Sequence, residues 1–520
     1  MLEGTNFIAG QKHVGDTFFH AVDAGTGETL DPAFNEAGEA EVALACSQAA
    51  EAQAVFGNLA PAKRAAFIRL AAAKIDALGD TLTQRAMRET GLPQARLEGE
   101  RGRTVGQLRL FADEIEAGRW QRVRIDHADP ARVPPKPDLR LRMIPLGPVA
   151  VFGASNFPLA FSVAGGDTAS AFAAGCCVVV KGHPAHPGTS ELVARAIVEA
   201  VAESGLPAGV FSLLQGTSHE LGEALVKDSN IAAVGFTGSR AGGLALMRHA
   251  QARPVPIPVY AEMSSVNPVV LMPQRLEQAA EDLGTAYVAS LSLGAGQFCT
   301  NPGIVLGVRG EALDRFLAAA KAALESVPAQ TMLSGGIRDN FERLVGGLAD
   351  KAERVAIGAE GEGSCGRAQL YTTSGKAFLS DPEFAAEMFG PSSILIQCDD
   401  LDQVDQILSG MEGQLTATLH LTHGDHEAAR QLLPTLERLA GRIIANGWPT
   451  GVDVTHAMVH GGPFPATSDG RSTSVGTLAI DRFLRPVAYQ DMPDALLPAQ
   501  LQDGAPGMPQ LVDGKMRHGT

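Results

Sequence analysis

The sequence predicts an α/β protein with two Rossmann-like domains and a small oligomerisation ribbon. Its 520 residues are too many for one ordinary core, so more than one domain is expected. Between residues 148 and 262, short and continuously apolar runs alternate with amphipathic helical segments, which is typical of a parallel sheet covered on both faces. A second region, 263–480, opens with a helix at 275–294 and mixes strands and helices again.

Five apolar runs predict the strands of the first sheet. They are VAVFG (149–153), CCVVVK (176–181), VFSLLQG (210–216), IAAVGFTG (231–238) and VPIPVYAE (255–262). The helices expected between them lie at 162–174, 189–204, 218–227 and 239–250. Because ligands bind at the carboxyl ends of the strands in such sheets, we expect a nucleotide site there.

Helices and a ribbon flank the first sheet. Residues 36–118 are rich in Ala, Leu, Glu and Arg at helical spacing, which predicts several amphipathic helices. In the stretch 122–145, alternating apolar and polar residues predict a strand with one buried face in a protruding ribbon. We therefore assign residues 1–121 and 146–262 to a cofactor-binding domain and residues 263–480 to a catalytic domain.

The chain is also expected to self-associate. A strand predicted at 483–493 and the ribbon at 122–145 have no place in either core, and both would leave backbone edges unpaired. Unpaired edges invite strands of another subunit, so we assign 122–145 and 481–498 to oligomerisation and expect a homodimer or homotetramer. The alternative is a ribbon that folds back on its own chain. Residues 499–520, rich in Gln, Pro and Gly, are expected to form a loose tail.

Composition excludes several kinds of partner and site. A formal net charge of −16, with no Lys- or Arg-rich run, argues against nucleic acid because an acidic surface repels phosphates. The six cysteines contain no CxxC pattern and are too few for a disulfide framework, so no metal site is expected. The uncharged stretch between Arg142 and Asp167 is long enough to span a bilayer, but its prolines and glycines indicate a strand, a loop and a helix start. We expect a cytoplasmic protein without a membrane partner.

Cys299 is the first candidate catalytic residue. It lies in the Gly-rich segment GAGQFCTNPG, just after the helix expected at 275–294. Backbone amides in such a loop can stabilise an oxyanion, and glycine lets a substrate approach closely. A thiolate that attacks an aldehyde forms a thiohemiacetal, which can pass a hydride to a nicotinamide and leave a thioester. A lone cysteine is more often a buried apolar residue, so the assignment depends on its neighbours.

Glu262 and Asn156 supply those neighbours. Glu262 ends the strand VPIPVYAE, where a carboxylate can enter a cleft as the general base for the thiol or for water. A solvated loop acid is the alternative for this residue. Asn156, in FGASNFPLAF, has an amide that can donate to an oxyanion, although asparagine is also a common turn residue.

Six motifs occur in register along the chain. They are SNFP (155–158), VVVKG (178–182), GFTGS (235–239), YAEMSSVNP (260–268), GQFC (296–299) and EMFGP (387–391). In order and spacing, this set resembles the aldehyde dehydrogenase superfamily over most of the chain. The resemblance implies the fold of that superfamily and a nicotinamide-dependent oxidation of a small aldehyde. It makes Cys299 the nucleophile, Glu262 the general base and Asn156 the oxyanion donor beside the amide of Cys299.

The same resemblance implies where the cofactor binds. Lys181 would hold the adenosine ribose, with His183 nearby, and Glu387 would hold the nicotinamide ribose, with Phe389 beside it. The turn that would pass the pyrophosphate contains Gly235, Thr237, Gly238 and Ser239. Members that transfer the acyl group to coenzyme A dispense with the Glu base. Because Glu262 is present here, hydrolysis to a free acid is expected.

The sequence departs from the family pattern at two places. The usual Leu-Gly-Gly after the base is Met-Ser-Ser at 263–265, which changes the packing of the loop but keeps Glu262. The glutamate that usually chelates both ribose hydroxyls is replaced by Pro184. With Lys181 and His183 nearby, a 2′-phosphate is tolerated there. We therefore expect NADP in preference to NAD, which remains possible.

The segments 446–477 and 181–191 indicate the substrate. They resemble the branch of 2,5-dioxopentanoate (α-ketoglutarate semialdehyde) dehydrogenases and bacterial fatty aldehyde dehydrogenases. The resemblance implies oxidation of 2,5-dioxopentanoate to 2-oxoglutarate in sugar-acid catabolism, with a broad-specificity or fatty aldehyde dehydrogenase as the alternative. No side chain for the substrate's distal acid is apparent from the sequence. A cofactor-free cysteine hydrolase would leave the nucleotide region without a purpose, and a non-enzymatic protein would not need Cys299, Glu262, Asn156 and Lys181 together.

Overall fold

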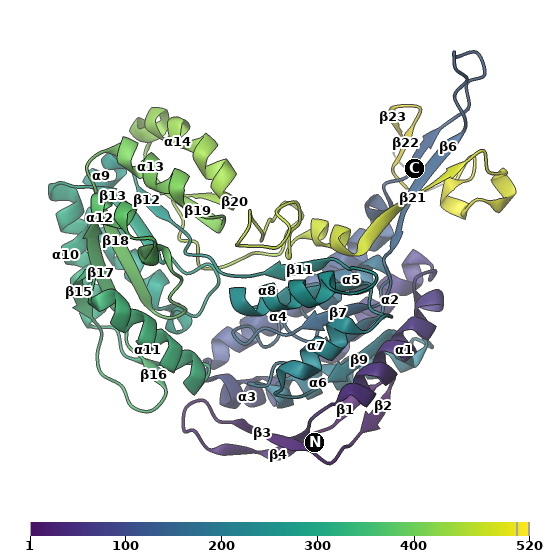
Figure 1. Ribbon diagram of the computed structural model, residues 1–520, viewed down its shortest axis with the longest axis horizontal. Coiled ribbons are helices and arrows are strands. Elements are labelled where there is room, and N and C mark those ends of the chain that lie inside the picture. The colour runs from purple at the N-terminus through teal and green to yellow at the C-terminus, as the bar shows by residue number, and fades with distance from the viewer. Residues whose placement is uncertain (1, 506–507, 518–520) are drawn as a thin grey trace.

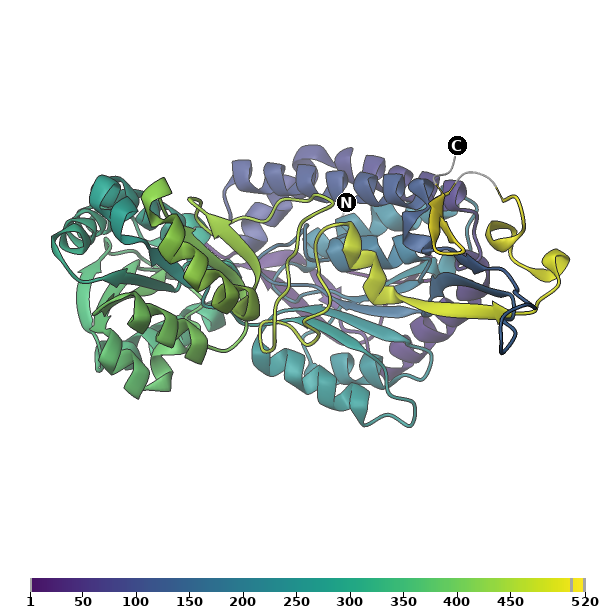
Figure 2. The same ribbon diagram turned by 90° about the horizontal axis from the view of Figure 1, so that it is seen from above.

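The computed structural model describes residues 2–505 and 508–517. Two α/β domains lie next to each other, and an arm of strands projects from the first domain (Figure 1). Seen from above, the C-terminal segment runs from the second domain across the first and into the arm (Figure 2). This arrangement confirms the predicted fold class.

The first domain is built on a seven-stranded sheet in the order β11-β10-β7-β8-β9-β1-β2. Its five parallel strands are the five predicted runs: β7 (Val149–Phe152), β8 (Val178–Lys181), β9 (Phe211–Leu214), β10 (Ala233–Thr237) and β11 (Val259–Glu262). At one edge, β1 (Asn6–Ile8) pairs antiparallel with β9 and with β2 (Gln11–His13). Every residue of β7 and β9 is buried, because helices cover both faces of the sheet.

The predicted helices of this domain are all present. Those between the strands are α5 (Gly166–Ala174), α6 (Pro187–Glu203), α7 (His219–Lys227) and α8 (Arg240–Gln251). Those of the preceding region are α1 (Glu39–Phe56), α2 (Pro61–Asp76), α3 (Gly79–Thr90) and α4 (Gln94–Ala117). Among the described helices, none is long and apolar enough to cross a membrane.

The second domain contains the sheet β15-β17-β18-β13-β12-β19-β20, which is parallel except at β15. Its strands are β12 (Val269–Leu271), β13 (Ile304–Val308), β15 (Glu353–Ile357), β17 (Gln369–Ser374), β18 (Ser392–Cys398), β19 (Gln414–His420) and β20 (Ala440–Ala445). Its helices are α9 (Pro273–Ser292), α10 (Glu311–Glu325), α11 (Gly335–Ala349), α12 (Gly375–Ser380), α13 (Leu401–Gly410) and α14 (His426–Leu439). The helix predicted at 275–294 is α9.

The arm is a third sheet, in the order β21-β6-β5-β22-β23. Its strands are β5 (Arg124–Asp126), β6 (Leu139–Pro145), β21 (Leu484–Gln490), β22 (Gln510–Val512) and β23 (Lys515–Arg517). The strand predicted in the ribbon, β6, pairs antiparallel with the predicted terminal strand, β21.

The expectation of a loose tail after residue 498 is wrong for the described residues. β22 pairs in parallel with β5, and Leu501 and Val512 are buried against Val123 and Ile125. These few apolar residues close a small core of their own. They stand far apart in a segment rich in Gln, Pro and Gly, so no periodic pattern reveals them.

The segment assigned to oligomerisation begins inside the first core. Arg482 is buried and forms an ion pair with Asp167 of α5 at 2.7 Å, and Phe483 is fully buried. Both residues lie just before β21. Cutting the chain at 481 would therefore damage the first domain as well as the arm.

Candidate active site

A cavity of about 1110 Å³ lies between the two domains, beyond the carboxyl ends of β7, β10 and β11. The predicted site residues in its wall are Asn156, Thr237, Gly238, Ser239, Glu262, Cys299, Glu387 and Phe389. Three other predicted residues do not line it. Lys181 and His183 lie at and just after the end of β8, and Gly235 lies inside β10.

Cys299 is positioned by a tight turn after α9. The 3-10 turn Leu293–Gly296 continues the helix, and its last three residues have positive φ. At Gly296 a Cβ atom would lie 2.4 Å from the backbone of Gly390, so only glycine permits this close approach. The turn brings Cys299 to the cavity wall as a half-buried residue.

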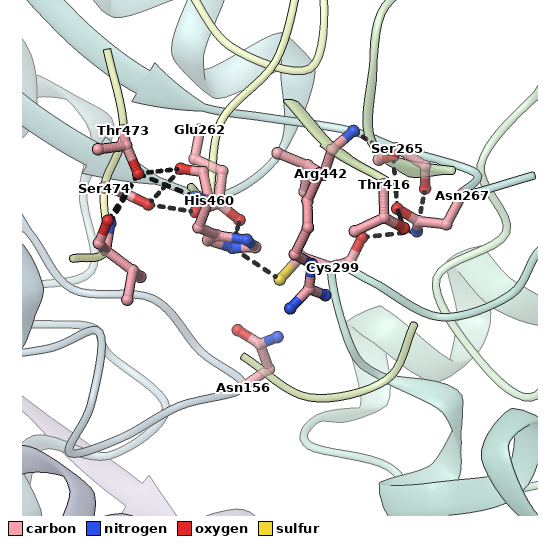
Figure 3. A network of polar contacts seen from close by, with 12 residues as sticks. Asn156, Glu262, Ser265, Asn267, Cys299, Thr416, Arg442, His460, Thr473 and Ser474 are labelled. Carbon is pink, nitrogen blue, oxygen red and sulfur yellow. Dashed lines mark hydrogen bonds and ion pairs between the residues drawn. The ribbon is translucent and has the colours of Figure 1, made fainter. Parts of the chain in front are cut away.

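Ser265, one of the departures from the family pattern, helps to hold the nucleophile's loop. Its Oγ is buried, 2.8 Å from Oδ1 of Asn267 and 2.9 Å from Oε1 of Gln414. Thr416 donates to the same Oδ1 at 3.0 Å. Nδ2 of Asn267 then donates to the carbonyl of Cys299 at 2.9 Å (Figure 3). The serine hydroxyl therefore ties the loop after β11 to β19 and, through Asn267, to the backbone of Cys299.

Cys299 and Glu262 meet at a third side chain, His460. Nε2 of His460 lies 3.4 Å from Sγ of Cys299 and 2.9 Å from Oε1 of Glu262 (Figure 3). The backbone N–H of His460 donates to Oγ1 of Thr473 at 2.8 Å. Oγ of Ser474 lies 3.1 Å from Oε2 of Glu262 and 3.1 Å from the carbonyl of His460. These contacts place one imidazole nitrogen close to both the thiol and the carboxylate, and Oε1 of Glu262 has no hydrogen-bond partner among the described residues.

Burial and charge determine the resting protonation of these groups. Burial raises the pKa of the Cys299 thiol well above its ordinary value, and the negative charge of Glu262 raises it further. Burial also acts to raise the pKa of Glu262, but the charge of His460 and hydrogen bonds from His460, Cys299 and Ser474 lower it overall. The resting site therefore holds a protonated thiol near an ionised carboxylate that can accept its proton.

Asn156 faces Cys299 from the loop after β7. Its Nδ2 donates to the carbonyl of Gln297 at 3.0 Å, which fixes the orientation of the amide. Figure 3 shows this amide pointing toward Cys299. A second N–H on the same nitrogen can serve, with the backbone N–H of Cys299, an oxygen that gains charge after attack by Sγ.

The end of β10 and the start of α8 fit the pyrophosphate of a dinucleotide. Ser239 caps α8 by accepting from the N–H of Gly242 at 3.2 Å, and it lines the cavity. Oγ1 of Thr237 is buried in the cavity wall with no hydrogen-bond partner among the described residues. A bound phosphate would satisfy this hydroxyl at the positive end of the helix dipole. Gly235 does not line the cavity. Packing explains the glycine at this position, because a Cβ there would lie 2.9 Å from the carboxylate of Asp167.

Lys181 and His183, which are predicted to lie near the 2′-phosphate of NADP, differ in charge. Burial lowers the pKa of Lys181 to about 8, and the nearby carboxylate of Glu36 opposes this shift. Burial, with the charges of His186 and Lys181, holds the pKa of His183 well below its ordinary value. His183 is therefore neutral near pH 7, so of this pair only Lys181 brings positive charge, and Glu36 offsets part of it.

Glu387 and Phe389 line the opposite wall of the cavity, on the second domain. Burial raises the pKa of Glu387 to about 8, and the charge of Glu262 adds to this rise. A carboxyl group with this pKa is mostly neutral at pH 7, and ribose hydroxyls can both donate to it and accept from it.

No sequence motif predicts a role for His460. The residue lies within the segment 446–477, which distinguishes the branch, but it follows Cys299 by 161 residues. No local spacing connects the two. Only the return of this segment past the end of β11, where Thr467 pairs with Glu262, brings the imidazole into the site.

Comparison with known proteins identifies the family. The sequence model of the aldehyde dehydrogenase family matches residues 11–472. The chain belongs to the aldehyde dehydrogenase family. It is 55% identical to alpha-ketoglutaric semialdehyde dehydrogenase 2 of Azospirillum brasilense, over 99% of this chain and 98% of that one. It is 45% identical to the alpha-ketoglutaric semialdehyde dehydrogenase of Acinetobacter baylyi, over 98% of each chain.

Solved structures share the fold at low sequence identity. The aldehyde dehydrogenase KauB of Pseudomonas aeruginosa matches with a TM-score of 0.81 at 22% identity, over 94% of this chain and 97% of that one. Aldehyde dehydrogenase C of Pseudomonas syringae, a mutant solved with NAD+ and octanal, gives a TM-score of 0.80 at 20% identity, over 95% and 98% of the two chains. As a member of this family, the protein is an NAD(P)-dependent aldehyde dehydrogenase, as predicted.

Proposed function

We propose that this aldehyde dehydrogenase oxidises 2,5-dioxopentanoate to 2-oxoglutarate, with Cys299 as nucleophile and Glu262 as general base. The main support for these roles is that Nε2 of His460 lies 3.4 Å from Sγ of Cys299 and 2.9 Å from Oε1 of Glu262. The two relatives with 55% and 45% identity, both alpha-ketoglutaric semialdehyde dehydrogenases, support the substrate. A broad-specificity or fatty aldehyde dehydrogenase is the alternative.

The first half-reaction makes a thioester. The proton of Cys299 passes to Glu262, whose Oε1 has no hydrogen-bond partner among the described residues, and Sγ then bonds to the aldehyde carbon. The aldehyde oxygen becomes an oxyanion that accepts hydrogen bonds from the N–H groups of Asn156 and Cys299. A bound NAD(P)+ would supply the acceptor for the hydride that leaves this carbon. The carbon–oxygen double bond re-forms, and the acyl group is left on Cys299.

The second half-reaction hydrolyses that thioester. Glu262 first releases the proton of the thiol to solvent. It then accepts a proton from water as the water oxygen bonds to the acyl carbon, and the carbon–sulfur bond breaks. Sγ leaves as a thiolate and takes the proton that Glu262 received from water. One aldehyde and one water thus yield one carboxylic acid, with two electrons leaving as hydride and one proton released to solvent.

A substrate series tests this function. We expect kcat/KM for 2,5-dioxopentanoate to exceed the values for hexanal and succinic semialdehyde by about tenfold or more with the better cofactor. Both NAD and NADP should be used in the series, with reduced cofactor followed by absorbance. A preference for hexanal with both cofactors would instead establish the broad or fatty aldehyde alternative.

We further propose that the enzyme prefers NADP to NAD. Pro184 stands where the family usually has a glutamate that would repel a 2′-phosphate, and Lys181 supplies positive charge nearby. The carboxylate of Glu36 works against this preference because it lies within electrostatic range of Lys181.

Lys181→Ala should raise KM for NADP by about tenfold and change KM for NAD much less, because a charged hydrogen bond to the 2′-phosphate is lost. Glu36→Gln is the matched variant. It removes the opposing charge and should lower KM for NADP. Initial rates with each cofactor at saturating aldehyde give both values. An equal effect of Lys181→Ala on the two cofactors would mean that this residue contacts only the ribose.

We also propose that the arm joins subunits. β21 and β23 lie at the two edges of its sheet, so each leaves one edge without a strand within the described chain. Large apolar side chains are also exposed on or near the arm. They are Val133, Leu139, Met492, Leu496 and Met516. Unpaired edges beside exposed apolar side chains are typical of surfaces that another subunit covers.

Light scattering at micromolar concentration should therefore give a particle of two or four chains. Deleting residues 485–520 should disrupt this assembly while the cofactor still binds, because that cut spares Arg482 and Phe483 of the first core. Deleting 481–520 should impair both properties. A stable monomer of 54.2 kDa for the full chain would contradict the proposal.

A further inference from the structure

We propose that Arg103 of α4 and Arg442 of β20 bind the carboxylate at the far end of the substrate. The inference rests on the proposed function, because it explains how an aldehyde that carries an acid is distinguished from a neutral one. Neither arginine belongs to the predicted site residues.

Arg442 extends toward the reacting sulfur. Figure 3 draws its side chain beside Cys299, and the two groups lie within electrostatic range of each other. Its Nη1 donates to the carbonyl of Gly451 at 2.9 Å and its Nη2 to the carbonyl of Pro449 at 3.0 Å. Its Nε is buried and has no partner in residues 2–505 and 508–517. Nη1 also approaches Sδ of Met458, so the donors left in reserve are Nε and the second N–H of Nη2.

Arg103 approaches the same loop from the other side. Its Nε donates to the carbonyl of Val452 at 3.2 Å, and its guanidinium lies over the ring of Phe161, 5.0 Å from the ring centre. Phe161 is itself part of the cavity wall with Cys299. Both Nη atoms of Arg103 are buried, and neither has a partner in the described part of the chain. A carboxylate is the group that satisfies two such donors at once.

No acid neutralises the pair by direct contact. The acceptors that the described chain offers to Arg103 and Arg442 are backbone carbonyls and, for Arg442, Sδ of Met458 at 3.8 Å. Burial lowers the pKa of both guanidiniums; Glu100 opposes this shift at Arg103, and Cys299, when ionised, opposes it in both. The two cations therefore lie within electrostatic range of the nucleophile and lack an anion of their own.

The acids nearest to Arg103 are occupied or exposed. Glu100 raises the pKa of Arg103, but it forms its ion pair with Arg96 at 2.6 Å. Asp453 is exposed and accepts the N–H of Val454 at 2.8 Å. These acids therefore leave the Nη donors of Arg103 unmet, and the donors are buried beside Phe161, which lines the cavity. A short aldehyde acid bound at Cys299 would satisfy them, whereas an alkyl chain would leave both cations unpaired.

The test compares 2,5-dioxopentanoate with pentanal, a neutral aldehyde of the same length. Arg103→Gln and Arg442→Gln should each lower kcat/KM for 2,5-dioxopentanoate on the order of 10- to 100-fold, and leave kcat/KM for pentanal within about threefold. Arg103→Lys and Arg442→Lys keep the charge without the planar fork, and they should recover part of the loss.

Arg253→Gln is the matched control. Arg253 is also buried and donates to two backbone carbonyls, those of Val226 and Ile231, at 3.0 Å each, but it holds a loop of the first domain. Its replacement should leave the ratio of the two kcat/KM values unchanged. This control separates loss of the carboxylate site from loss of any buried arginine.

The outcomes also separate this inference from the proposed function. If the wild-type enzyme does not favour 2,5-dioxopentanoate over pentanal, the proposed substrate is wrong. A second outcome is that the wild type favours 2,5-dioxopentanoate while the Arg103 and Arg442 variants lower kcat/KM for both aldehydes by equal factors, or for neither aldehyde. In that case only the carboxylate site is wrong. A loss confined to 2,5-dioxopentanoate in these variants, absent in Arg253→Gln, supports the inference.

Discussion

Cys299→Ser should abolish dehydrogenase turnover and leave cofactor binding nearly intact. The hydroxyl is similar in size to the thiol but is a far poorer nucleophile near neutral pH. The loop should keep its position, because Asn267 holds the backbone carbonyl of residue 299 at 2.9 Å and not its side chain. Turnover followed by cofactor absorbance, with cofactor binding measured by titration calorimetry, checks both parts of this expectation.

Cys365→Ser is the matched control for that experiment. Cys365 is the other half-buried cysteine of the chain, and the remaining four are buried. Its replacement should leave turnover at the wild-type level. Activity of the Cys299→Ser variant above about a tenth of wild type would remove Cys299 from its assigned role.

Glu262→Gln should lower kcat by about two orders of magnitude or more. The amide keeps the shape of the side chain but cannot accept a proton from the thiol or from water. The pKa of Glu262 is lowered by His460 and Ser474, so in the wild type its contribution is present at neutral pH and is lost as pH falls through that lowered value. Without the carboxylate, the thiol must ionise unaided, and activity should move to alkaline pH.

A pH series of kcat for the wild type and the variant measures this shift. Ser474→Ala, which removes one neighbour of Glu262 at 3.1 Å but keeps the carboxylate, should cost much less activity. If Glu262→Gln retained the wild-type kcat across neutral pH, the general base would have to be another residue.

The parallel framework and the three candidate catalytic residues of the cavity can be predicted from the sequence. The strands of the first sheet are continuously apolar because both faces are covered, and this signal is local. Cys299, Glu262 and Asn156 lie in motifs at the ends of such elements, and the structure brings all three to one cavity. Their catalytic roles stay predictions until the variants are measured.

Other features depend on contacts between distant segments, which no local pattern records. His460 reaches Glu262 only because the returning segment 446–477 passes the end of β11. Arg103 and Arg442 come from the two different domains and meet at one loop. The buried residues of the tail, such as Leu501, are too sparse to show a period.

The measurement that tests the central claim most directly is mass spectrometry of the enzyme after acid quench within the first turnover. The wild type is mixed with 2,5-dioxopentanoate and its better cofactor, then digested. The claim predicts an acyl group on the peptide that contains Cys299, formed only when oxidised cofactor is present. An acyl group on Cys365, or no acyl group in an enzyme that is producing 2-oxoglutarate, would contradict it.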